Sequence, residues 1–373
     1  MRILHVTPSY KPAYHYGGPT LSVSRLAEAQ AAVGTSVSVF TTTANGNAEL
    51  EVPVGVQVQD NGVAIWYFSR WTGDHGHFSP ALLLHLWREG KSYDVVNIHS
   101  WWNWVAFGAA LVCKLRGYKT VVSPHGMLSP YTLASWRKRW FQQTVGKWLL
   151  NGTVFHATSN QEARELQKIW PGHRCFVAPN VVPLPDDLPL SKRPDHSDFH
   201  LLFISRVHHK KGLELLFEAL CRLEGPWRLT IAGNGAQGYE NQLRKRIKTL
   251  GLQNRIVWNG WVSQDQKWDL IADADLMVLP SYNENFANVV VEALATGTPV
   301  LLSDRVGLCN YVRSLDFGWV VERKVEALHQ ALKESMRDTG KRLRILRDAP
   351  RKIRDDFDPP TVARRYIDQY LAL

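Results

Sequence analysis

Two glutamates lie eight residues apart in the segment 280–293, in surroundings that suit the binding of a single ligand. Glu284 follows the apolar run DLMVLP and so lies in a loop after a buried strand, whereas Glu292 lies in the helix expected to follow. Valine, alanine and leucine surround Glu292, and a carboxylate in such company is costly unless something binds it. The pair predicts a site in which both carboxylates accept hydrogen bonds from hydroxyl groups, while the amides of Asn288 and Val289 face an anionic group such as a diphosphate.

A basic loop, 205–212, directly follows the apolar run HLLFIS and opens a helix. Arg206 and Lys211 lie five residues apart across this loop, so both side chains can reach the same space at the carboxyl edge of a sheet. A guanidinium and an ammonium converging there would neutralise a diphosphate, which gains negative charge when it departs in a transfer reaction. A solvated basic loop is the alternative, and the motif alone does not separate the two.

Two further loops carry residues suited to ligand binding. Gly17 and Gly18 precede an expected helix and would let backbone amides approach an anion, with an ordinary flexible turn as the equal alternative. No G-x-G-x-x-G pattern is present and no acidic residue ends the second strand, which argues against a nicotinamide cofactor. His125 follows the run KTVVS and His99 ends the run DVVNIHS, so both imidazoles are placed at the carboxyl end of a strand. The alternative for each histidine is a structural role.

Short apolar, β-branched runs alternate with amphipathic helical stretches along the chain, which predicts an α/β fold with two doubly wound, Rossmann-like domains. The expected strands span 2–7, 36–41, 63–68, 94–99, 119–123, 153–158 and 174–178 in the first series, and 200–205, 227–232, 255–258, 275–279, 299–303 and 319–321 in the second. A segment rich in proline and aspartate, 179–198, is predicted to link them. We expect domains over 1–182 and 183–358 that face each other across a cleft, with a helix over 359–373 packing back on the first.

The composition is that of a folded protein with a basic surface: 45 % hydrophobic residues, 21 % charged residues and a formal net charge of +10 over 373 residues. Between Asp94 and Glu162 the chain has seven basic residues and no acidic one, a distribution that attracts phosphates, anionic lipid headgroups or nucleic acid. No nucleic-acid-binding module is recognisable, so no nucleic acid partner is expected. The scattered cysteines Cys113, Cys175, Cys221 and Cys309 predict no disulfide framework or zinc site. With no long apolar run either, we expect a cytoplasmic protein, at most peripheral on the inner face of the cell membrane.

Together these motifs resemble glycosyltransferase family 4, whose members have the GT-B fold. The similarity rests on the E-x7-E pattern of Glu284 and Glu292, the ALATGTPV segment that follows it, and the loop of Arg206 and Lys211, and it covers essentially the whole chain. The resemblance implies a retaining transfer of a hexose from a nucleotide-diphosphate sugar to a hydroxyl group of a saccharide acceptor. Ala287 stands where the family usually has glycine, and its methyl group is expected to fit if its φ angle is negative.

The resemblance also implies roles for individual residues. His125, Glu284, Arg206 and Lys211 would form the catalytic set, and Glu292 would bind the ribose. The implied donor site comprises Gly17, Gly18, Arg206, Lys211, Gly233, Asn234, Val262, Glu284, Asn285, Phe286, Ala287, Asn288, Val289 and Glu292. No cofactor and no metal ion are expected, because the two cations and helix N-termini would supply the positive charge that the diphosphate needs.

A stretch rich in tryptophan and basic residues is the candidate region for the acceptor or a membrane surface. It contains Trp136, Arg137, Lys138, Arg139, Trp140, Phe141, Lys147 and Trp148. On a helix, Trp136, Trp140 and Phe141 are expected to share one side, as in an interfacial helix against anionic headgroups or a seat for a polyprenyl-diphosphate carrier. A core-facing aromatic stripe with a solvated basic face is the equal alternative.

The expected context is cell-surface or exopolysaccharide assembly, with a nucleotide-sugar donor and a polyprenyl-diphosphate-linked saccharide acceptor. Two alternatives stay open: an enzyme of the same fold with a soluble small-molecule acceptor, and a nucleotide-sugar epimerase. A donor-binding scaffold without activity is disfavoured, because the carboxylates, the two cations and His125 are all present.

Overall fold

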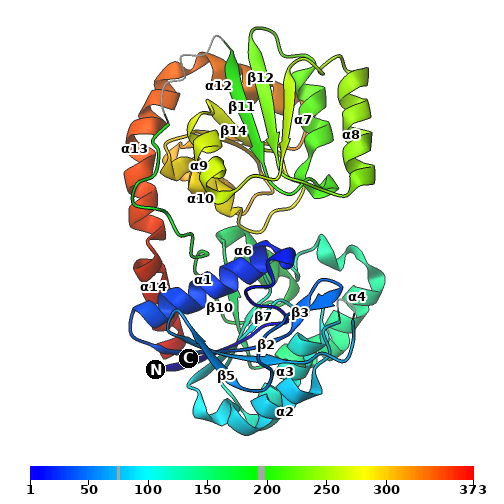
Figure 1. The fold of residues 1–373 in the computed structure, drawn as a ribbon, viewed down its shortest axis with the longest axis vertical. Coiled ribbons are helices and arrows are strands. Elements are labelled where there is room, and N and C mark those ends of the chain that lie inside the picture. Colours follow the sequence, from blue (N-terminus) through cyan, green and yellow to red (C-terminus); the bar gives the residue numbers. More distant parts are fainter. Residues whose placement is uncertain (74–75, 192–197) are drawn as a thin grey trace. The chain divides into compact units, whose positions relative to one another are not determined.

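The computed structural model describes residues 1–73, 76–191 and 198–373 (Figure 1). The chain divides into two compact units: unit 1 comprises Met1–Pro183 and Asp358–Leu373, and unit 2 comprises Leu184–Phe357. The boundaries expected from the sequence were 182/183 and 358/359. Each unit is built around one sheet with helices packed on it, so each is described by itself.

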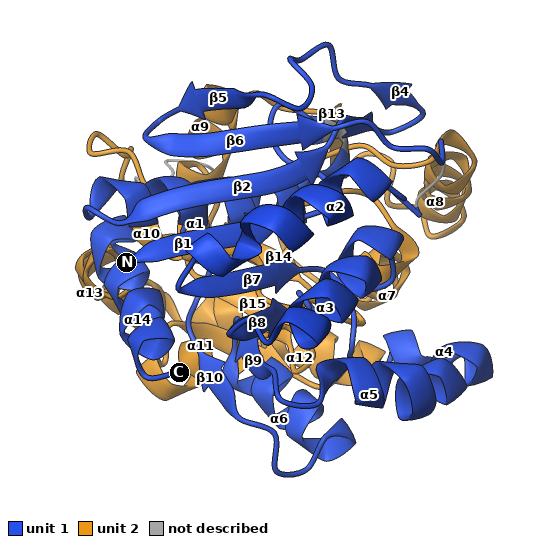
Figure 2. Ribbon diagram, turned by 90° about the horizontal axis from the view of Figure 1, so that it is seen from below, with its two compact units in different colours: residues 1–183, 358–373 blue, residues 184–357 orange. Residues whose placement is uncertain are grey.

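The sheet of unit 1 has eight strands in the order β10-β9-β8-β7-β1-β2-β6-β5, and all neighbours are parallel except β5 and β6 (Figure 2). These strands are β1 (Arg2–Val6), β2 (Ser36–Thr42), β5 (Gln57–Asp60), β6 (Val63–Phe68), β7 (Val95–His99), β8 (Thr120–Ser123), β9 (Val154–Ala157) and β10 (Cys175–Val177). A separate short hairpin pairs β3 (Ala44–Asn45) with β4 (Ala48–Glu49). Because β1 has β2 on one side and β7 on the other, the order of connection reverses there, which is where ligands gather in such sheets.

Helices cover both faces of this sheet. They are α1 (Gly18–Ala32), α2 (Pro80–Glu89), α3 (Trp104–Arg116), α4 (Trp136–Phe141), the π-helical turn η4 (Gln142–Gly146), α5 (Lys147–Leu150), α6 (Asn160–Ile169) and α14 (Pro359–Leu371). On one face α1 packs against α14, whose Tyr366 and Tyr370 are buried in the core. On the other face, residues of α2, α3, α5 and α6 share one core with the alternate residues of β1, Leu4 and Val6. The C-terminal helix is therefore part of unit 1.

The sheet of unit 2 has six parallel strands in the order β13-β12-β11-β14-β15-β16. They are β11 (Phe199–Ile204), β12 (Trp227–Ala232), β13 (Ile256–Gly260), β14 (Leu276–Leu279), β15 (Val300–Ser303) and β16 (Gly318–Val321). The helices of this unit are α7 (Leu213–Leu220), α8 (Gln237–Thr249), α9 (Gln264–Ala272), α10 (Asn288–Ala295), α11 (Cys309–Leu315), α12 (Val325–Arg337) and α13 (Thr339–Phe357). Here the order of connection reverses between β11 and β14.

Local sequence explains several element boundaries. The side chains of Ser79, Asn103 and Ser159 each accept a hydrogen bond from a first-turn amide and so start α2, α3 and α6. Ser263 and Gln266 form a reciprocal capping box that starts α9. These caps fix where each helix begins, and thereby place the loops that precede the helices at the carboxyl ends of the strands.

All thirteen strands expected from the sequence are present, with ends that differ by two residues at most. The predictions missed β3, β4 and β5, which are short and, except for Ala44, at least partly exposed, so they contain no apolar run to indicate them. In the expected linker, Val181 is buried in the core of unit 1, and the amide of Ser191 donates to the carbonyl of Thr296 within unit 2. Its residues 192–197 lie outside the described residues.

Candidate active site

The chemistry-bearing loops of unit 2 meet at the carboxyl ends of β11 and β14, the point where the strand order reverses. The amide of Tyr282, in the loop after β14, donates to the carbonyl of Lys210, in the loop after β11, over 2.7 Å. Gly212 has a φ of 73°, and a β-carbon there would overlap the carbonyl oxygen of Pro280. The two loops therefore pack backbone against backbone, and only glycine permits this approach.

Lys211 and Glu284 form an ion pair across these two loops, with side chains that are 15 % and 22 % exposed. The backbone of Glu284 is held on both sides, since its amide donates to Arg305 and its carbonyl accepts from Gly307. Arg206 is exposed at the start of the same basic loop and has no ion-pair partner among the described residues. The structure thus brings Lys211 and Glu284 together and leaves Arg206, at the start of the same loop, exposed and with its charge uncompensated among the described residues.

Glu292 is not the isolated carboxylate that the sequence suggested. Lys267, in α9, donates to its Oε1 over 2.8 Å, and the side chains of the two residues are only 14 % and 9 % exposed. Among the described residues its Oε2 has no hydrogen-bond partner. The ion pair explains how α10 tolerates a buried acid, and one oxygen stays available for a ligand hydroxyl group.

Close packing explains the glycines in the loop after β12. A β-carbon at Gly233 would overlap the carbonyl oxygen of Ser205, and one at Gly235 would overlap that of Val207. The carbonyl of Asn234 accepts from the amide of Val207, so this loop lies against the basic loop after β11. The predicted donor residues Gly233 and Asn234 are thus next to the start of the loop that carries Arg206.

Val262 lines a separate cavity of about 450 Å³ at the end of β13. Its walls are Asn259, Trp261, Val262, Gln266, Asp269 and Leu270, and the Trp261 ring is 74 % exposed. Lys267, the ion-pair partner of Glu292, directly follows Gln266 in α9. An aromatic face beside a carboxylate and amides suits a flat base and its ribose.

Ala287 and Phe286 differ from the expectation. Ala287 has a φ of +73°, so the negative φ under which its methyl group would fit is not present. The left-handed conformation costs a non-glycine residue about 1–2 kcal/mol. Phe286 is buried and packs edge-on against Phe357, so its side chain belongs to the core and only its backbone can face a donor. Asn285 follows Glu284 in this loop, and Asn288 and Val289 begin α10, where first-turn amides are available to an anion.

We expect Ala287→Gly to raise the free energy of unfolding by about 0.5–1 kcal/mol. Glycine relieves the left-handed strain, and its greater freedom in the unfolded chain offsets part of that gain. Thermal unfolding of this variant beside Ala295→Gly, a change at the last residue of α10, where the backbone is right-handed, tests the assignment. Ala295→Gly should lower the unfolding temperature. A lower unfolding temperature for Ala287→Gly as well would show that the backbone at 287 is not strained.

Unit 1 contributes a chain of histidines at the carboxyl ends of β1, β7 and β8, in which His5 and His99 are buried and His125 is half-buried. His5 Nδ1 lies 2.8 Å from His99 Nε2, and His99 Nδ1 lies 3.0 Å from His125 Nε2. At the far end, His5 Nε2 lies 2.7 Å from the side-chain oxygen of Gln30. His125 itself has a φ of 49°, and the next amide, of Gly126, donates to Glu162 over 2.6 Å. The two histidines that the sequence singled out are thus in direct contact.

Burial holds these rings neutral at neutral pH. Removal from water lowers the pKa of His5 to about 4, with the hydrogen bond to Gln30 opposing the shift, and lowers the pKa of His125 to about 4. Burial and then the neighbouring histidines hold the pKa of His99 well below its usual range. A neutral imidazole has one N–H, so with Gln30 accepting from His5 each ring donates toward the previous one. That direction leaves His125 Nδ1, which has no partner among the described residues, as a hydrogen-bond acceptor.

A fourth histidine, His156, lies near the carboxyl end of β9 in the same sheet. Its burial determines how the unfolding free energy depends on pH. Its ring lies 2.9 Å from the hydroxyl of Ser123 and 2.8 Å from that of Tyr366, and burial lowers its pKa to about 3. Below about pH 6.5 the unfolded chain binds a proton that the folded ring does not, so stability is fully present above pH 6.5 and is lost as the pH falls toward 3.

We therefore expect His156→Gln to reduce the pH dependence of the unfolding free energy between pH 6 and 4 by about 1.4 kcal/mol per pH unit. Thermal unfolding midpoints at several pH values measure this slope, with His209→Gln, an exposed histidine, as control. If the slopes of wild type and His156→Gln coincide, the buried ring is not neutral in the folded chain.

Sequence reasoning missed Lys267, His5, Gln30 and His156. The signal for the histidines was present: His5, Asn97, Ser123 and His156 each interrupt an otherwise apolar strand near its carboxyl end. No comparable signal identifies Lys267, because it lies 25 residues from Glu292 on another element.

Gly17 and Gly18 lie after β1, at the same edge of the sheet as the histidines. Gly17 has a φ of 67° and precedes α1, and Gly18 is the first residue of that helix. A β-carbon at either glycine would meet no atom within 4 Å. The space over this helix start is therefore open, and the glycines leave its amides accessible.

The basic aromatic stretch lies on the surface of unit 1, which excludes the core-facing alternative for its tryptophans. Trp136, Trp140 and Trp148 are 70 %, 62 % and 51 % exposed. Phe141 does not share their side: it packs against Phe107, with ring centroids 4.9 Å apart. The expectation that it would was wrong, because 3.6 residues per turn place it about 140° from Trp136. The basic residues Arg137, Lys138 and Arg139 lie on the same short helix, α4.

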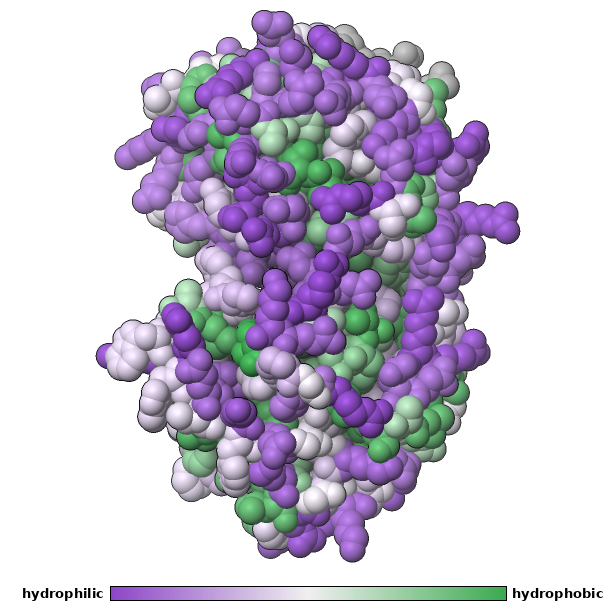
Figure 3. All heavy atoms as spheres, turned by 180° about the vertical axis from the view of Figure 1, so that it is seen from behind, coloured by the Kyte–Doolittle hydropathy of each residue, from purple (hydrophilic) through white to green (hydrophobic). Residues whose placement is uncertain are grey.

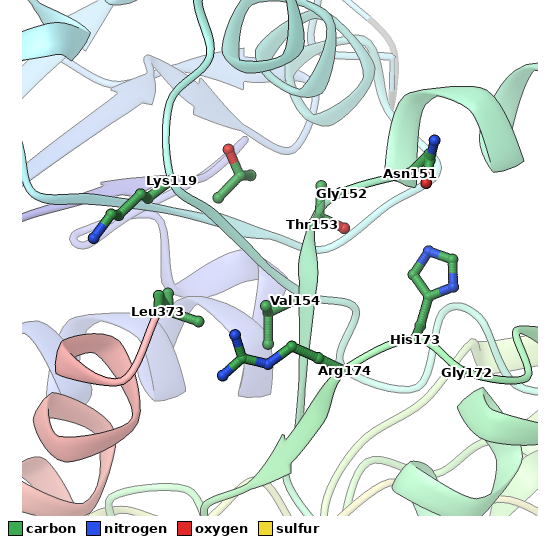
Figure 4. A pocket seen from close by; sticks show the side chains of 10 residues that line it. Lys119, Asn151, Gly152, Thr153, Val154, Gly172, His173, Arg174 and Leu373 are labelled. Atoms are coloured by element: carbon green, nitrogen blue, oxygen red, sulfur yellow. The ribbon is translucent and has the colours of Figure 1, made fainter.

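A cavity of about 330 Å³ opens at the amino ends of β8, β9 and β10, the edge of the sheet opposite the histidines. Figure 4 shows Lys119, Arg174 and Leu373 on one side of Val154, with Asn151 and His173 on the other. Arg174 donates to the carbonyl of Ala372 and so ties α14 to this edge. None of the predicted site residues lines this cavity, and ligands of such sheets bind at the other edge.

The described residues lack two further features. They contain no group of three or more histidine, cysteine, aspartate or glutamate side chains placed to hold a metal ion. They also contain no helix long and apolar enough to span a bilayer.

Comparison with known families decides the assignment. Residues 16–184 match Glycosyltransferase Family 4, and residues 188–352 match Glycosyl transferases group 1. This chain belongs to the group 1 glycosyltransferases. It is therefore an enzyme that transfers a sugar from a nucleotide sugar, and its two units form the GT-B fold that the sequence predicted.

Related proteins are named for several different activities. The GDP-mannose:cellobiosyl-diphosphopolyprenol alpha-mannosyltransferase of Xanthomonas campestris is 29 % identical to this glycosyltransferase over 291 residues, which is 76 % of this chain and 75 % of that protein. The glycogen synthase of Mycobacterium tuberculosis is 28 % identical over 322 residues, 81 % of this chain and 75 % of that protein. An uncharacterised glycosyltransferase of Methanocaldococcus jannaschii is 28 % identical over 46 % of this chain and 44 % of its own length.

Solved structures share the fold over the whole chain. The structure of Anabaena Alr3699/HepE in complex with UDP and glucose superposes with a TM-score of 0.75 at 22 % identity, covering 100 % of both chains. WaaG, a glycosyltransferase involved in lipopolysaccharide biosynthesis, superposes with a TM-score of 0.68 at 17 % identity, covering 99 % of both chains. At these identities the likeness concerns the fold alone.

Proposed function

We propose that this glycosyltransferase transfers a hexose, with retention of the anomeric configuration, from a nucleotide-diphosphate sugar to a hydroxyl group of a lipid-linked saccharide in cell-surface or exopolysaccharide biosynthesis. The observation that carries the proposal is the Lys211–Glu284 ion pair at the reversal of strand order in unit 2, with an exposed Arg206 at the start of the same loop. In this assignment a diphosphate binds the two cations, and the released Glu284 carboxylate accepts from hydroxyl groups of the sugar.

The proposed reaction needs no enzyme nucleophile. The bond between the anomeric carbon and the diphosphate oxygen breaks, the acceptor oxygen bonds to the same face of that carbon, and the acceptor proton passes to the departing diphosphate. Lys211, Arg206 and the first-turn amides of α10 stabilise the charge that develops on that group. His125 accepts a hydrogen bond from a sugar hydroxyl through Nδ1, and Glu292 binds the ribose through its free oxygen.

The lipid-linked acceptor is proposed from the relative in Xanthomonas campestris, because that enzyme is named for a diphosphopolyprenol-linked acceptor. The donor base is left open by the comparisons, since that relative is named for GDP-mannose and the Anabaena structure contains UDP. Thermal shifts with UDP, GDP, ADP and TDP test the donor site directly: one nucleotide should stabilise the chain, by about 2.7 kcal/mol at a hundred times its Kd. Absence of a shift with all four nucleotides would contradict the proposed donor site.

Product analysis separates the proposal from its alternatives. Incubation with the donor alone should give at most slow hydrolysis, whereas a new nucleotide sugar would identify an epimerase. Transfer to a free disaccharide as efficient as transfer to the same disaccharide on a lipid diphosphate would identify a soluble acceptor. Under the proposal, the lipid-linked form is the better acceptor.

We expect the transfer to be insensitive to EDTA, because Arg206, Lys211 and the helix amides supply the positive charge that a divalent ion provides in other transferases. Initial rates with 5 mM EDTA, about the level that strips weakly held divalent ions, should equal those with added Mg²⁺. Complete loss of activity on chelation, restored by Mg²⁺ or Mn²⁺, would show that the two cations do not suffice.

We also propose that unit 1 lies against an anionic membrane surface through the exposed tryptophans and basic residues of α4 and α5. Figure 3 shows pale side chains of intermediate hydropathy beside strongly hydrophilic ones at the edge of unit 1 that carries α4, which is at the left in that view. Flotation with vesicles containing anionic lipid at low salt tests this surface. A protein that stays in the soluble fraction would contradict the membrane part of the proposal and leave the transfer reaction untouched.

A further inference from the structure

A second cavity in unit 1, about 710 Å³ in volume, lies between the α4–η4–α5 stretch and the end of α6. Its volume is within the range of small-molecule sites. The lining residues are Pro130, Leu133, Ala134, Arg139, Gln142, Gln143, Lys147, Lys168, Ile169, Trp170, Pro171 and His173. None of the site residues predicted from the sequence lines this cavity except Arg139.

The side chains that line the cavity carry positive charges that no acidic lining residue neutralises. Arg139, Lys147 and Lys168 come from three different elements, and none of them has an ion-pair partner among the described residues. No acidic residue lines the cavity. Three positive charges around one concave surface favour an anion with more than one charge, such as a diphosphate.

The same cavity contains a buried polar donor that has no partner. Gln142 is 2 % exposed, its Oε1 accepts from Trp101 Nε1 over 2.7 Å, and its Nε2 has no hydrogen-bond partner. The glutamine lies on the π-helical turn against Gly146, where any β-carbon would meet its amide at about 2.5 Å. The bond to Trp101 and the contact with Gly146 fix this amide inside the wall of the cavity, so Gln142 anchors the stretch that carries Arg139 and Lys147 to the core.

The rest of the lining is apolar. Leu133 and Trp170 are buried, Ile169 is half-buried, and Pro130 and Pro171 lie at the margins. Exposed Trp136, Trp140 and Trp148 lie on the same helical stretch. A cavity that joins several cations to an apolar wall, beside aromatic side chains that suit a bilayer interface, fits an amphiphile with an anionic head better than a free sugar or phosphate.

One helix connects this cavity to the candidate catalytic histidine. Glu162, in the first turn of α6, accepts from the amide of Gly126 next to His125, whereas Lys168 and Ile169, in its last turn, line the cavity. Six residues at 1.5 Å each separate Glu162 from Lys168 by about 9 Å along the helix axis. An acceptor saccharide attached to a diphosphate in the cavity would therefore extend along α6 toward His125.

We propose that this cavity binds the diphosphate and the first isoprene units of the acceptor's lipid carrier. Arg139, Lys147 and Lys168 hold the diphosphate, and the apolar wall of Leu133, Ile169 and Trp170 receives the chain. This inference rests on the proposed function, in which the acceptor is lipid-linked.

A calorimetric titration with geranylgeranyl diphosphate tests the site. The titration is done in detergent, which is kept below the detergent's critical micelle concentration. Wild type should bind this probe at least ten-fold more tightly than inorganic pyrophosphate or geranylgeraniol. The triple variant R139Q/K147Q/K168Q should lose at least ten-fold in affinity, and so should Ala134→Trp, which fills the cavity without changing charge. The matched control R88Q/K91Q/R164Q removes three exposed charges of unit 1 outside the cavity and should bind as wild type does.

The outcomes separate this site from the function on which it rests. Equal loss in the control triple would show general charge attraction, and equal binding of pyrophosphate would show a plain anion site; both overturn the proposal. Unchanged binding by the cavity variants places the lipid elsewhere and also overturns it, while nucleotide thermal shifts and sugar transfer by the same preparations show whether the proposed function still holds.

Discussion

Replacing Lys211 with alanine is expected to lower kcat/KM for the nucleotide-sugar donor by about 10²–10³-fold, the usual effect of removing one donor aimed at developing charge. In the proposed reaction the diphosphate gains negative charge as the sugar departs, so Lys211 is expected to stabilise the transition state more than the bound donor. The loss should therefore lie mainly in kcat, with a smaller rise in KM. Initial rates over a range of donor concentrations separate the two constants.

Two variants accompany this measurement. Lys211→Arg keeps the charge and should retain more activity than Lys211→Ala, although a guanidinium does not reproduce the position of an ammonium. Lys248→Ala removes an exposed lysine from the last turn of α8 and should leave both constants unchanged. If the Lys211→Ala enzyme has the wild-type kcat, the ion pair with Glu284 has only a structural role. The diphosphate then binds at a site that does not include Lys211.

Replacing His125 with alanine is expected to lower kcat by about 10²-fold, because under the proposed function the variant loses a polar contact to the transferred sugar. His99 acts through His125 and is a positioning residue. His99→Leu interrupts the chain of rings and should lower kcat about ten-fold, the value of roughly one hydrogen bond, with the donor KM unchanged. His99→Gln keeps a donor and an acceptor and should recover most of that loss.

The three histidine variants distinguish positioning from simple destabilisation. Their thermal unfolding temperatures are measured with the kinetics, and the comparison uses rates well below the lowest of them. If His99→Leu and His99→Gln lose the same activity, the orientation of the His125 ring does not depend on the chain through His99. If His125→Ala keeps full kcat, the edge of the unit 1 sheet makes no contact with the reacting sugar.

The parts of the site that sequence reasoning found share one property: each follows a recognisable apolar strand. Because parallel strands end at one edge, Arg206, Lys211 and Glu284 could be grouped from their positions after β11 and β14 alone. His125 and His99 were found in the same way. Strand order was not needed, since the carboxyl edge is common to all strands of a sheet.

What the sequence did not indicate depends on tertiary contacts and on backbone conformation. Lys267 meets Glu292 across two helices, and His5 meets His99 only because β1 and β7 are neighbours. The positive φ of Ala287 is a conformation that alanine does not favour, so its residue type predicted the opposite. Gln142 owes its direction to a π-helical turn, which no periodic pattern identifies.

A crystal structure of this glycosyltransferase with the nucleoside diphosphate that stabilises it best tests the central claim most directly. The account predicts the β-phosphate within hydrogen-bond distance of Lys211 and Arg206, the Lys211–Glu284 ion pair opened, and a ribose hydroxyl on Glu292. A diphosphate bound at another surface, such as the cavity of Lys119 and Arg174, with the Lys211–Glu284 pair intact, would contradict it.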